Sequence, residues 1–195
     1  MNAWELNLSE INQEAAAFKE QLRKRSGANL AECCQCGKCT AACPFAPYMD
    51  VMPRQIVRYV QLAQLEAALT AKTPWICASC YTCSCRCPQE INLPALMECL
   101  RQEATRQGKI AVKEVDLFAR TFMKTVRAFG RSHEMLMMGL FNIRSLHFFQ
   151  DLRYAPTLYL KGKIHLLPQR IKDRATLRRL IEQSTSQVKK GGEKA

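Results

Sequence analysis

The sequence lacks the short motifs that mark most enzymes. It contains no G-x-G-x-x-G fingerprint, no phosphate-binding loop ending in G-K-[ST] and no H-E-x-x-H metal helix. It has only three histidines, His133, His147 and His165, and none lies near a nucleophile pattern. The sequence therefore predicts no catalytic residues, and we expect these histidines to lie at a surface or an interface.

Long hydrophobic runs are also missing. The longest strictly apolar windows, such as residues 135–138, fall far short of the roughly 20 residues that cross a bilayer. The opening MNAWELNLSE lacks the basic start, apolar core and cleavage site of a secretory signal. We therefore expect a cytoplasmic protein without a membrane span, in which the 11 cysteines are metal-binding thiolates and not disulfides.

Positive charge is concentrated in the C-terminal part. Residues 1–119 hold 13 Lys and Arg against 12 Asp and Glu, whereas residues 120–195 hold 16 against 5. The C-terminal part therefore differs in net charge from the part that bears the cysteines, which indicates a separate region of the chain. It lacks the regular aromatic interleaving of a strand-binding platform, so we expect an acidic protein neighbour or solvent, and no nucleic acid.

Ten of the cysteines fall in two runs, CCQCGKCTAACP and CASCYTCSCRCP. Each run fits C-x-x-C-x-x-C-x-x-x-C-P, and the whole register repeats further along the chain, with the pairs Cys33/Cys77, Cys36/Cys80, Cys39/Cys83 and Cys43/Cys87. Zinc sites use paired C-x-x-C units and seldom a third cysteine at the next step. The repeat therefore favours two iron–sulfur clusters over zinc.

This spacing resembles that of bacterial-type two-cluster ferredoxins, in which the fourth cysteine of each run binds the other cluster. The resemblance implies one 4Fe-4S cluster on Cys33, Cys36, Cys39 and Cys87, and a second on Cys77, Cys80, Cys83 and Cys43. We expect Gly37 to remove a side chain where the first loop comes close to its cluster. Three cysteines remain outside the register, and we expect small buried packing residues there: Cys34, Cys85 and Cys99.

Helical patterns surround the two runs. Apolar stripes predict a helix over residues 8–22, one from Pro53 toward Leu69, and one from Pro94 to Ala104 that stops at Gly108. No segment alternates like a strand. The sequence predicts an all-α fold, an α-helical ferredoxin, with an N-terminal helix (1–30), a two-cluster domain (31–110) and a basic, helical and irregular C-terminal extension (111–195).

The extension begins with an amphipathic pattern from Val115 to Val126, broken at Gly130. It fits a helix packed on the core at least as well as a helix that docks a partner. The following patch of Met135, Met137, Met138 and Phe141 favours an adaptable interface. Residues 150–172 are predicted to be an irregular arm, followed by a last helix after Asp173.

The two runs, their helical linker and the later FGRSHE resemble the C subunits of heterodisulfide reductases over roughly residues 28–145. This resemblance implies a non-catalytic electron-transfer component of a hetero-oligomer. Its partners would be an A subunit that bears flavin and clusters, and a B subunit whose cysteine-rich C-C-G domains reduce a disulfide. We expect the C-terminal extension to dock partners.

Two other interpretations share the same cluster motif. One is an iron–sulfur component of a membrane quinone-linked oxidoreductase, and the other is a free-standing ferredoxin-like carrier. The composition of the partner complex distinguishes them, because the motif is common to all three.

Overall fold

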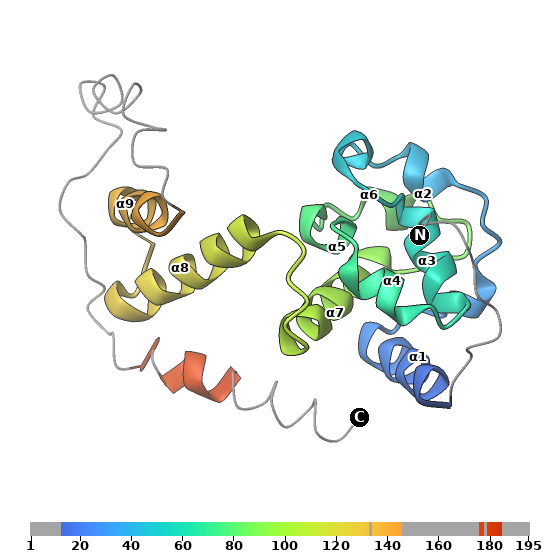
Figure 1. Ribbon diagram of the computed structural model, residues 1–195, viewed down its shortest axis with the longest axis horizontal. Helices are drawn as coiled ribbons and strands as arrows, with labels where there is room; N and C mark the ends of the chain where they lie inside the picture. Colours follow the sequence, from blue (N-terminus) through green and yellow to red (C-terminus); the bar gives the residue numbers. More distant parts are fainter. Residues whose placement is uncertain (1–12, 133, 146–175, 178, 185–195) are drawn as a thin grey trace. The chain divides into compact units, whose positions relative to one another are not determined.

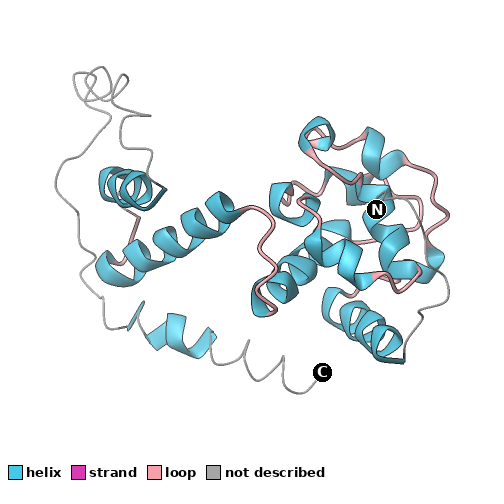
Figure 2. Cartoon of the chain, in the orientation of Figure 1, coloured by secondary structure: helices cyan, strands magenta, loops and turns pink. Residues whose placement is uncertain are grey.

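The computed structural model describes residues 13–132, 134–145, 176–177 and 179–184 (Figure 1). All regular secondary structure in these residues is helical (Figure 2), which confirms the predicted all-α fold. The chain divides between Val112 and Lys113 into two compact units, unit 1 and unit 2. No helix in the described ranges is long and apolar enough to cross a membrane.

Unit 1 consists of short helices that alternate with the cysteine loops. They are α1 (Gln13–Ser26), η2 (Leu30–Glu32), α2 (Lys38–Ala41), η3 (Ala46–Tyr48), α3 (Pro53–Gln61), α4 (Leu65–Thr70), α5 (Thr73–Ile76), α6 (Thr82–Cys85) and α7 (Leu93–Arg106). Unit 2 contains α8 (Lys113–Phe129) and α9 (Glu134–Ser145), and residues 176–177 and 179–184 are also helical.

Helix α7 is the centre of unit 1. The Asn92 side chain accepts a hydrogen bond from the backbone N–H of Ala95 (3.2 Å) and so caps the first turn, and Pro94 lies where no N–H is needed. Helix α7 packs with α1, α4, α5 and α6. The core combines its buried face with those of α3 and α1, through Leu96, Leu100, Ile56, Val57, Val60 and Leu22. Because α7 closely follows the second cysteine run, this packing holds that run against the core.

The stripe predicted as one helix from Pro53 toward Leu69 is divided in the structure. Ala63 has φ 57° between α3 and α4, and the backbone N–H of Gln64 donates to the carbonyl of Tyr59 (2.8 Å). Pro74 lies in the first turn of a new helix, α5. The break lets α4 turn back and pack on both α3 and α7.

A buried carboxylate joins α1 to α7. Glu103 is only 2% exposed and lies 2.8 Å from Arg106 and 3.7 Å from Arg25 of α1. Gln107 donates a further bond to it (2.8 Å). Two cations around one buried anion keep the charge compensated, so α1 is fixed to the rest of the unit.

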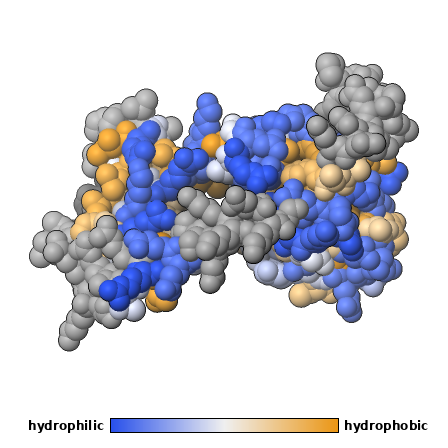
Figure 3. Space-filling model, turned by 90° about the horizontal axis from the view of Figure 1, so that it is seen from below, coloured by the Kyte–Doolittle hydropathy of each residue, from blue (hydrophilic) through white to orange (hydrophobic). Residues whose placement is uncertain are grey.

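In unit 2, α8 and α9 pack together, and the rings of Phe118 and Phe141 meet edge to face at 5.9 Å. The predicted helix that breaks at Gly130 is confirmed as α8. Several large apolar side chains of the pair nevertheless remain exposed: Phe118, Phe122, Met123, Leu140 and Ile143. Apolar residues accordingly reach the molecular surface in Figure 3. The expected arm at residues 150–172, and the side chain of Met135, lie outside the described residues.

Candidate metal centre

The two cysteine runs fold into loops of the same conformation. Cys33 and Cys77 each end a short helix in extended backbone, with φ −65° and ψ 108° for the first and φ −61° and ψ 116° for the second. Gly37 and Tyr81 then start α2 and α6 from the left-handed region, with φ 80° and 61°. The repeat seen in the sequence is therefore a repeat of backbone geometry.

A second left-handed residue stands in each loop, Gln35 with φ 57° and Ser79 with φ 52°. Alternation of left- and right-handed residues makes successive backbone N–H groups converge, which forms a concave site for an anion. Three of these four positions lack glycine, and an L-residue there costs about 1–2 kcal/mol. Such strain persists where the surroundings fix the backbone, as at ligand sites.

Gly37 has a second reason to be glycine besides the expected approach to a cluster. Its φ of 80° lies in the left-handed region, which favours glycine. Among the described protein atoms, a Cβ placed on it would meet Cδ of Arg54 at 3.9 Å, which is an ordinary contact. Tyr81 adopts the same conformation with a large side chain that is 50% exposed.

Cysteines from both loops line one pocket. Its wall contains Cys33, Cys36, Cys39 and, from the second run, Cys87. The pocket encloses about 360 Å³, open solvent included, and its other lining residues are Cys34, Gln35, Gly37, Lys38, Arg54, Val57, Pro88, Gln89, Ile91 and Leu93. The structure thus brings together the four cysteines expected for the first cluster, and we call this space the first pocket.

The other four cysteines lie near enough to one another for their thiolate charges to interact, and the charge of Cys39 also acts on Cys83. Burial raises the pKa of the Cys77 thiol, and the negative charges of Cys43 and Cys80 raise it further. Burial likewise raises the pKa of Cys83 to about 11, with a further contribution from Cys77. Cys43 comes from the first run, so each group includes one cysteine of the other run. Helices α2 and α6, which carry Cys39 and Cys83, lie in contact.

The thiols differ in how easily they ionise. The backbone N–H of Lys38 lowers the pKa of Cys36, and the Thr82 hydroxyl lowers the pKa of its register equivalent, Cys80. Burial raises the pKa of Cys39, the equivalent of Cys83. Each loop therefore combines an exposed, readily ionised thiol with a half-buried thiol that is harder to ionise.

These residues fit an iron–sulfur cluster better than zinc. Among the described residues, no three of His, Cys, Asp and Glu lie close enough to share one metal ion. Ligands of a cubane stand around a body of eight atoms, so their sulfur atoms are farther apart than around one zinc ion. The donors are thiolates only, which suits iron–sulfur chemistry.

The three cysteines outside the register have different outcomes. Cys99 is 7% exposed on α7, which confirms the predicted packing role. Cys34 and Cys85 are exposed, so their expected burial is wrong. Cys34 lines the first pocket, where its side chain contributes to the lowered pKa of Cys36, and Cys85 is the last residue of α6.

Gln61 and Gln35 support the first loop and were missed in the sequence. The Gln61 amide donates to the carbonyls of Leu30 (2.8 Å) and Cys33 (3.3 Å). Gln35 donates to Oε1 of Gln61 (3.3 Å) and approaches the Cys33 sulfur at 3.5 Å. Nothing in the spacing marks Gln61, because it is a polar residue at the end of an apolar stripe.

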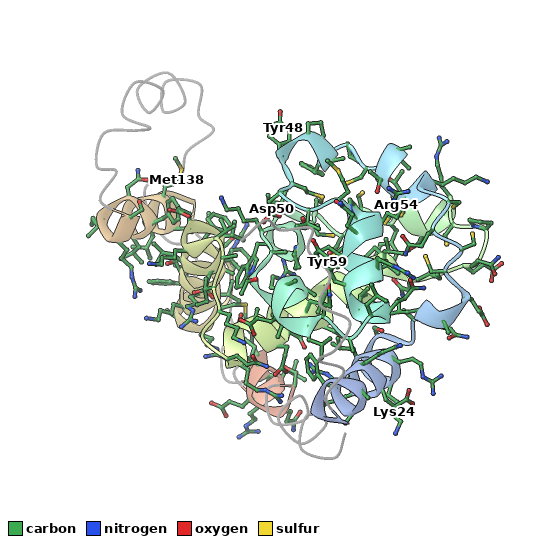
Figure 4. The ribbon with its side chains drawn as sticks, turned by 45° about the vertical axis from the view of Figure 1, so that its right-hand side comes forward. Lys24, Tyr48, Asp50, Arg54, Tyr59 and Met138 are labelled. Carbon is green, nitrogen blue, oxygen red and sulfur yellow. The ribbon has the colours of Figure 1, made fainter. Side chains whose placement is uncertain are left out.

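Asp50 supports the second loop. Its carboxylate accepts bonds from the backbone N–H groups of Lys72 (2.9 Å) and Thr73 (3.2 Å) and from the Thr73 hydroxyl (3.0 Å). These groups begin α5, which leads directly to Cys77. Figure 4 shows Asp50 beside this part of unit 1. The three histidines lie outside the described residues.

Comparison with known families identifies the class of the domain. Residues 29–91 match the family described as "4Fe-4S dicluster domain". The matched segment contains both cysteine runs in full and is helical wherever it has regular structure. Two 4Fe-4S clusters, the cofactors predicted from the spacing, are thereby confirmed.

The chain is similar to the C subunits of several heterodisulfide reductases, which confirms the resemblance seen in the sequence. It is 36% identical over 114 residues to the C subunit of the ferredoxin:CoB-CoM heterodisulfide reductase of Methanosarcina acetivorans, covering 58% of this chain and 45% of that protein. It is 32% identical over 94 residues to the C subunit of the H(2):CoB-CoM heterodisulfide,ferredoxin reductase of Methanothermobacter marburgensis, covering 48% and 51%.

A third relative is the C2 subunit of the H(2)/formate:CoB-CoM heterodisulfide,ferredoxin reductase of Methanococcus maripaludis. It is 31% identical over 111 residues, which cover 57% of this chain and 60% of that protein. The chain thus spans about half the length of the curated relatives it matches.

Proposed function

We propose that this chain is the electron-transfer component of a heterodisulfide-reductase-type complex in the cytoplasm. It would relay electrons between an A subunit that bears flavin and clusters and a disulfide-reducing B subunit with C-C-G domains. Its relatives are named as subunits of such reductases, which supports a hetero-oligomer. The chain itself offers no catalytic group in this scheme.

The observation that carries the proposal is the crossing of the fourth cysteines. Cys87 lines the first pocket with Cys33, Cys36 and Cys39, and Cys43 lies near enough to Cys77 for its charge to raise the pKa of that thiol. We assign the first cluster to Cys33, Cys36, Cys39 and Cys87, and the second to Cys77, Cys80, Cys83 and Cys43. When bound, each 4Fe-4S cluster accepts or releases one electron.

The residues around the sites have three tasks. The eight thiolates hold the cofactors and occupy every iron with cysteine, so no open position remains for a substrate. Crossed ligands and the contact between α2 and α6 keep the two sites adjacent. Gln61 and Asp50 fix the entry of each loop, so that the ligand geometry changes little when charge is gained or lost.

The basic C-terminal part is proposed to dock a partner protein. Apolar side chains of α8 and α9 remain exposed in the described part of unit 2, and this leaves surface for a contact. Deleting the chain from Gly130 onward should weaken assembly with the partners. Undiminished assembly of that truncated chain would contradict this assignment.

The decisive experiment is anaerobic purification of the tagged chain from its native cells. Co-purifying proteins are identified by mass spectrometry, and iron, sulfide and flavin are measured. We expect a flavoprotein and a C-C-G-domain protein in the same complex. A lone chain with about eight irons would instead establish a diffusible carrier, and a membrane partner would establish quinone-linked chemistry.

A further inference from the structure

The basic side chains of unit 1 differ in whether a carboxylate compensates them. Five lie within 4 Å of one: Arg23, Arg25, Arg101, Arg106 and Lys109. Lys38, Arg54 and Arg58 are exposed, and within the described ranges none of these three forms an ion pair. Arg58 donates to the oxygen of the neutral amide of Gln61 (3.4 Å).

These three cations gather at one place. Lys38 and Arg54 line the first pocket together with its cysteines, and Arg58 follows Arg54 by one turn of α3. The buried face of α3 holds Ile56 and Val57 against the core, so the two arginines project outward. We call Lys38, Arg54 and Arg58 the cationic mouth.

In the described part of the chain, no carboxylate forms an ion pair with this mouth. Glu32 and Glu90 are the carboxylates nearest to the first-pocket cysteines in the sequence, yet neither lines the pocket. Glu32 instead accepts a hydrogen bond from Asn29 (2.7 Å). A patch of one sign at the opening of a cofactor site attracts oppositely charged partners and raises their association rate.

The surroundings of the second group of cysteines are different. Tyr81 directly follows Cys80, and Phe45 and Tyr48 follow Cys43; all three side chains are exposed. Arg101, the cation whose charge reaches Cys77, is already paired with Glu98. Four other cations of unit 1 also form no ion pair in the described ranges, but none of them lines the first pocket: Lys19, Lys24, Lys72 and Arg86.

We propose that the cationic mouth is the docking surface for an acidic electron-transfer protein, which it brings to the first pocket. This inference rests on the proposed function and adds the chemistry of one partner and its place of contact. Charge complementarity of this kind acts on the rate of encounter and weakens with ionic strength. A purely local role, compensation of the negative cluster, would instead change the reduction potential.

The test compares two substitutions with the same charge change in the full chain, purified anaerobically with its clusters. Arg54→Glu reverses a charge at the mouth. Lys24→Glu reverses one on the exposed side of α1, and Figure 4 shows the two residues well apart on unit 1. Arg54→Lys keeps the charge and serves as the rescue variant.

Cluster reduction is followed by stopped-flow absorbance with two donors of opposite charge: a reduced, acidic two-cluster ferredoxin, and the methyl viologen radical cation. Arg54→Glu should lower the second-order rate with ferredoxin about tenfold at low salt, and the difference should close as salt is raised. Lys24→Glu and Arg54→Lys should stay within about twofold of the natural chain. Reduction by methyl viologen should not slow.

Three outcomes would overturn the docking surface, and the last of them would also refute the relay. Equal slowing of both donors by Arg54→Glu, with a shifted midpoint potential, would assign Arg54 to the cluster itself. Equal effects of Arg54→Glu and Lys24→Glu on the rate of reduction by ferredoxin would show that this rate depends on the net charge of the chain and not on the cationic mouth. A natural chain that holds both clusters but accepts electrons from neither donor would refute the proposed relay, and the docking surface with it.

Discussion

The two cysteine loops have the same backbone and different neighbours. Register equivalents share extended first cysteines, left-handed third and fifth residues and a short helix. Yet the first loop is held by the amide of Gln61 and opens beside cations that form no ion pair in the described ranges, whereas the second is held by the carboxylate of Asp50 and carries the exposed ring of Tyr81.

This difference shows that a cluster site places one requirement on the backbone of its loop and another on the residues outside the loop. The shape of a loop that encloses a cofactor is set by backbone dihedrals and ligand positions, so it repeats. The residues outside the loop decide potential, access and partners, so they are free to diverge. Four sets of substitutions can break or sharpen this contrast.

The largest effect should come from Cys87→Ser, with Cys85→Ser as its control. Both residues lie beside the end of α6, but only Cys87 lines the first pocket. We expect Cys87→Ser to lower the iron content from about eight to about four per chain, because one cluster loses a ligand. Iron analysis and electron paramagnetic resonance after anaerobic purification provide the measurement. Iron loss in the Cys85 variant would contradict the assigned register.

Asp50→Ala should come next, because it leaves the start of the second loop without its acceptor. Loss of charge-assisted bonds to two backbone N–H groups and the buried Thr73 should lower the free energy of unfolding by about 2 kcal/mol. Urea unfolding followed by circular dichroism would measure it. Asp50→Asn keeps one acceptor oxygen and should lose about half as much. Equal stability of the natural chain and both Asp50 variants would show that the hydrogen bonds of Asp50 to Lys72 and Thr73 do not form in solution.

Gln61→Glu tests the corresponding tie of the first loop. The substitution keeps the acceptor for Gln35 but removes both donated bonds, to the carbonyls of Leu30 and Cys33. We expect a loss of about 1 to 1.5 kcal/mol in the same urea experiment, since two neutral hydrogen bonds are broken. An unchanged urea midpoint would argue that water replaces the amide at no cost.

The smallest effects should be opposite in sign. Gly37→Ala places a Cβ in left-handed backbone and should lower stability by about 1 kcal/mol. Tyr81→Gly relieves the same conformation in the second loop and should raise stability by about 0.5 kcal/mol, because part of the gain is offset by the entropy of glycine in the unfolded chain. Urea unfolding of both variants measures the two changes. A loss in both would mean that the Tyr81 ring contributes packing that outweighs its backbone strain.

Much of this molecule could be predicted from its pattern of residues. Helices α7 and α8 follow from apolar spacing and end near glycines, and the cysteine spacing alone indicates the class of site. The grouping of Cys87 with the first run also agrees with expectation. These features could be predicted because they depend on residues close together in the sequence or on the repeated cysteine spacing.

What could not be predicted depends on contacts distant in sequence. The turn at Ala63 contains no glycine or proline, so nothing marks the end of α3. The burial of Cys34 was judged from residue type, whereas its exposure follows from the path of the loop. Asp50 and Gln61 are ordinary polar residues until the fold brings each to the entry of a cysteine loop.

The position of Cys87 in the first pocket has a consequence for the unfolded chain. In the proposed assignment each cofactor would be held by cysteines of both runs. One would then cross-link the chain between Cys39 and Cys87, and the other between Cys43 and Cys77. Closing long segments removes conformational entropy from the unfolded state, as a disulfide does. Loss of either cofactor, for instance by oxygen, would therefore loosen the helices that lie between the runs as well as the site itself.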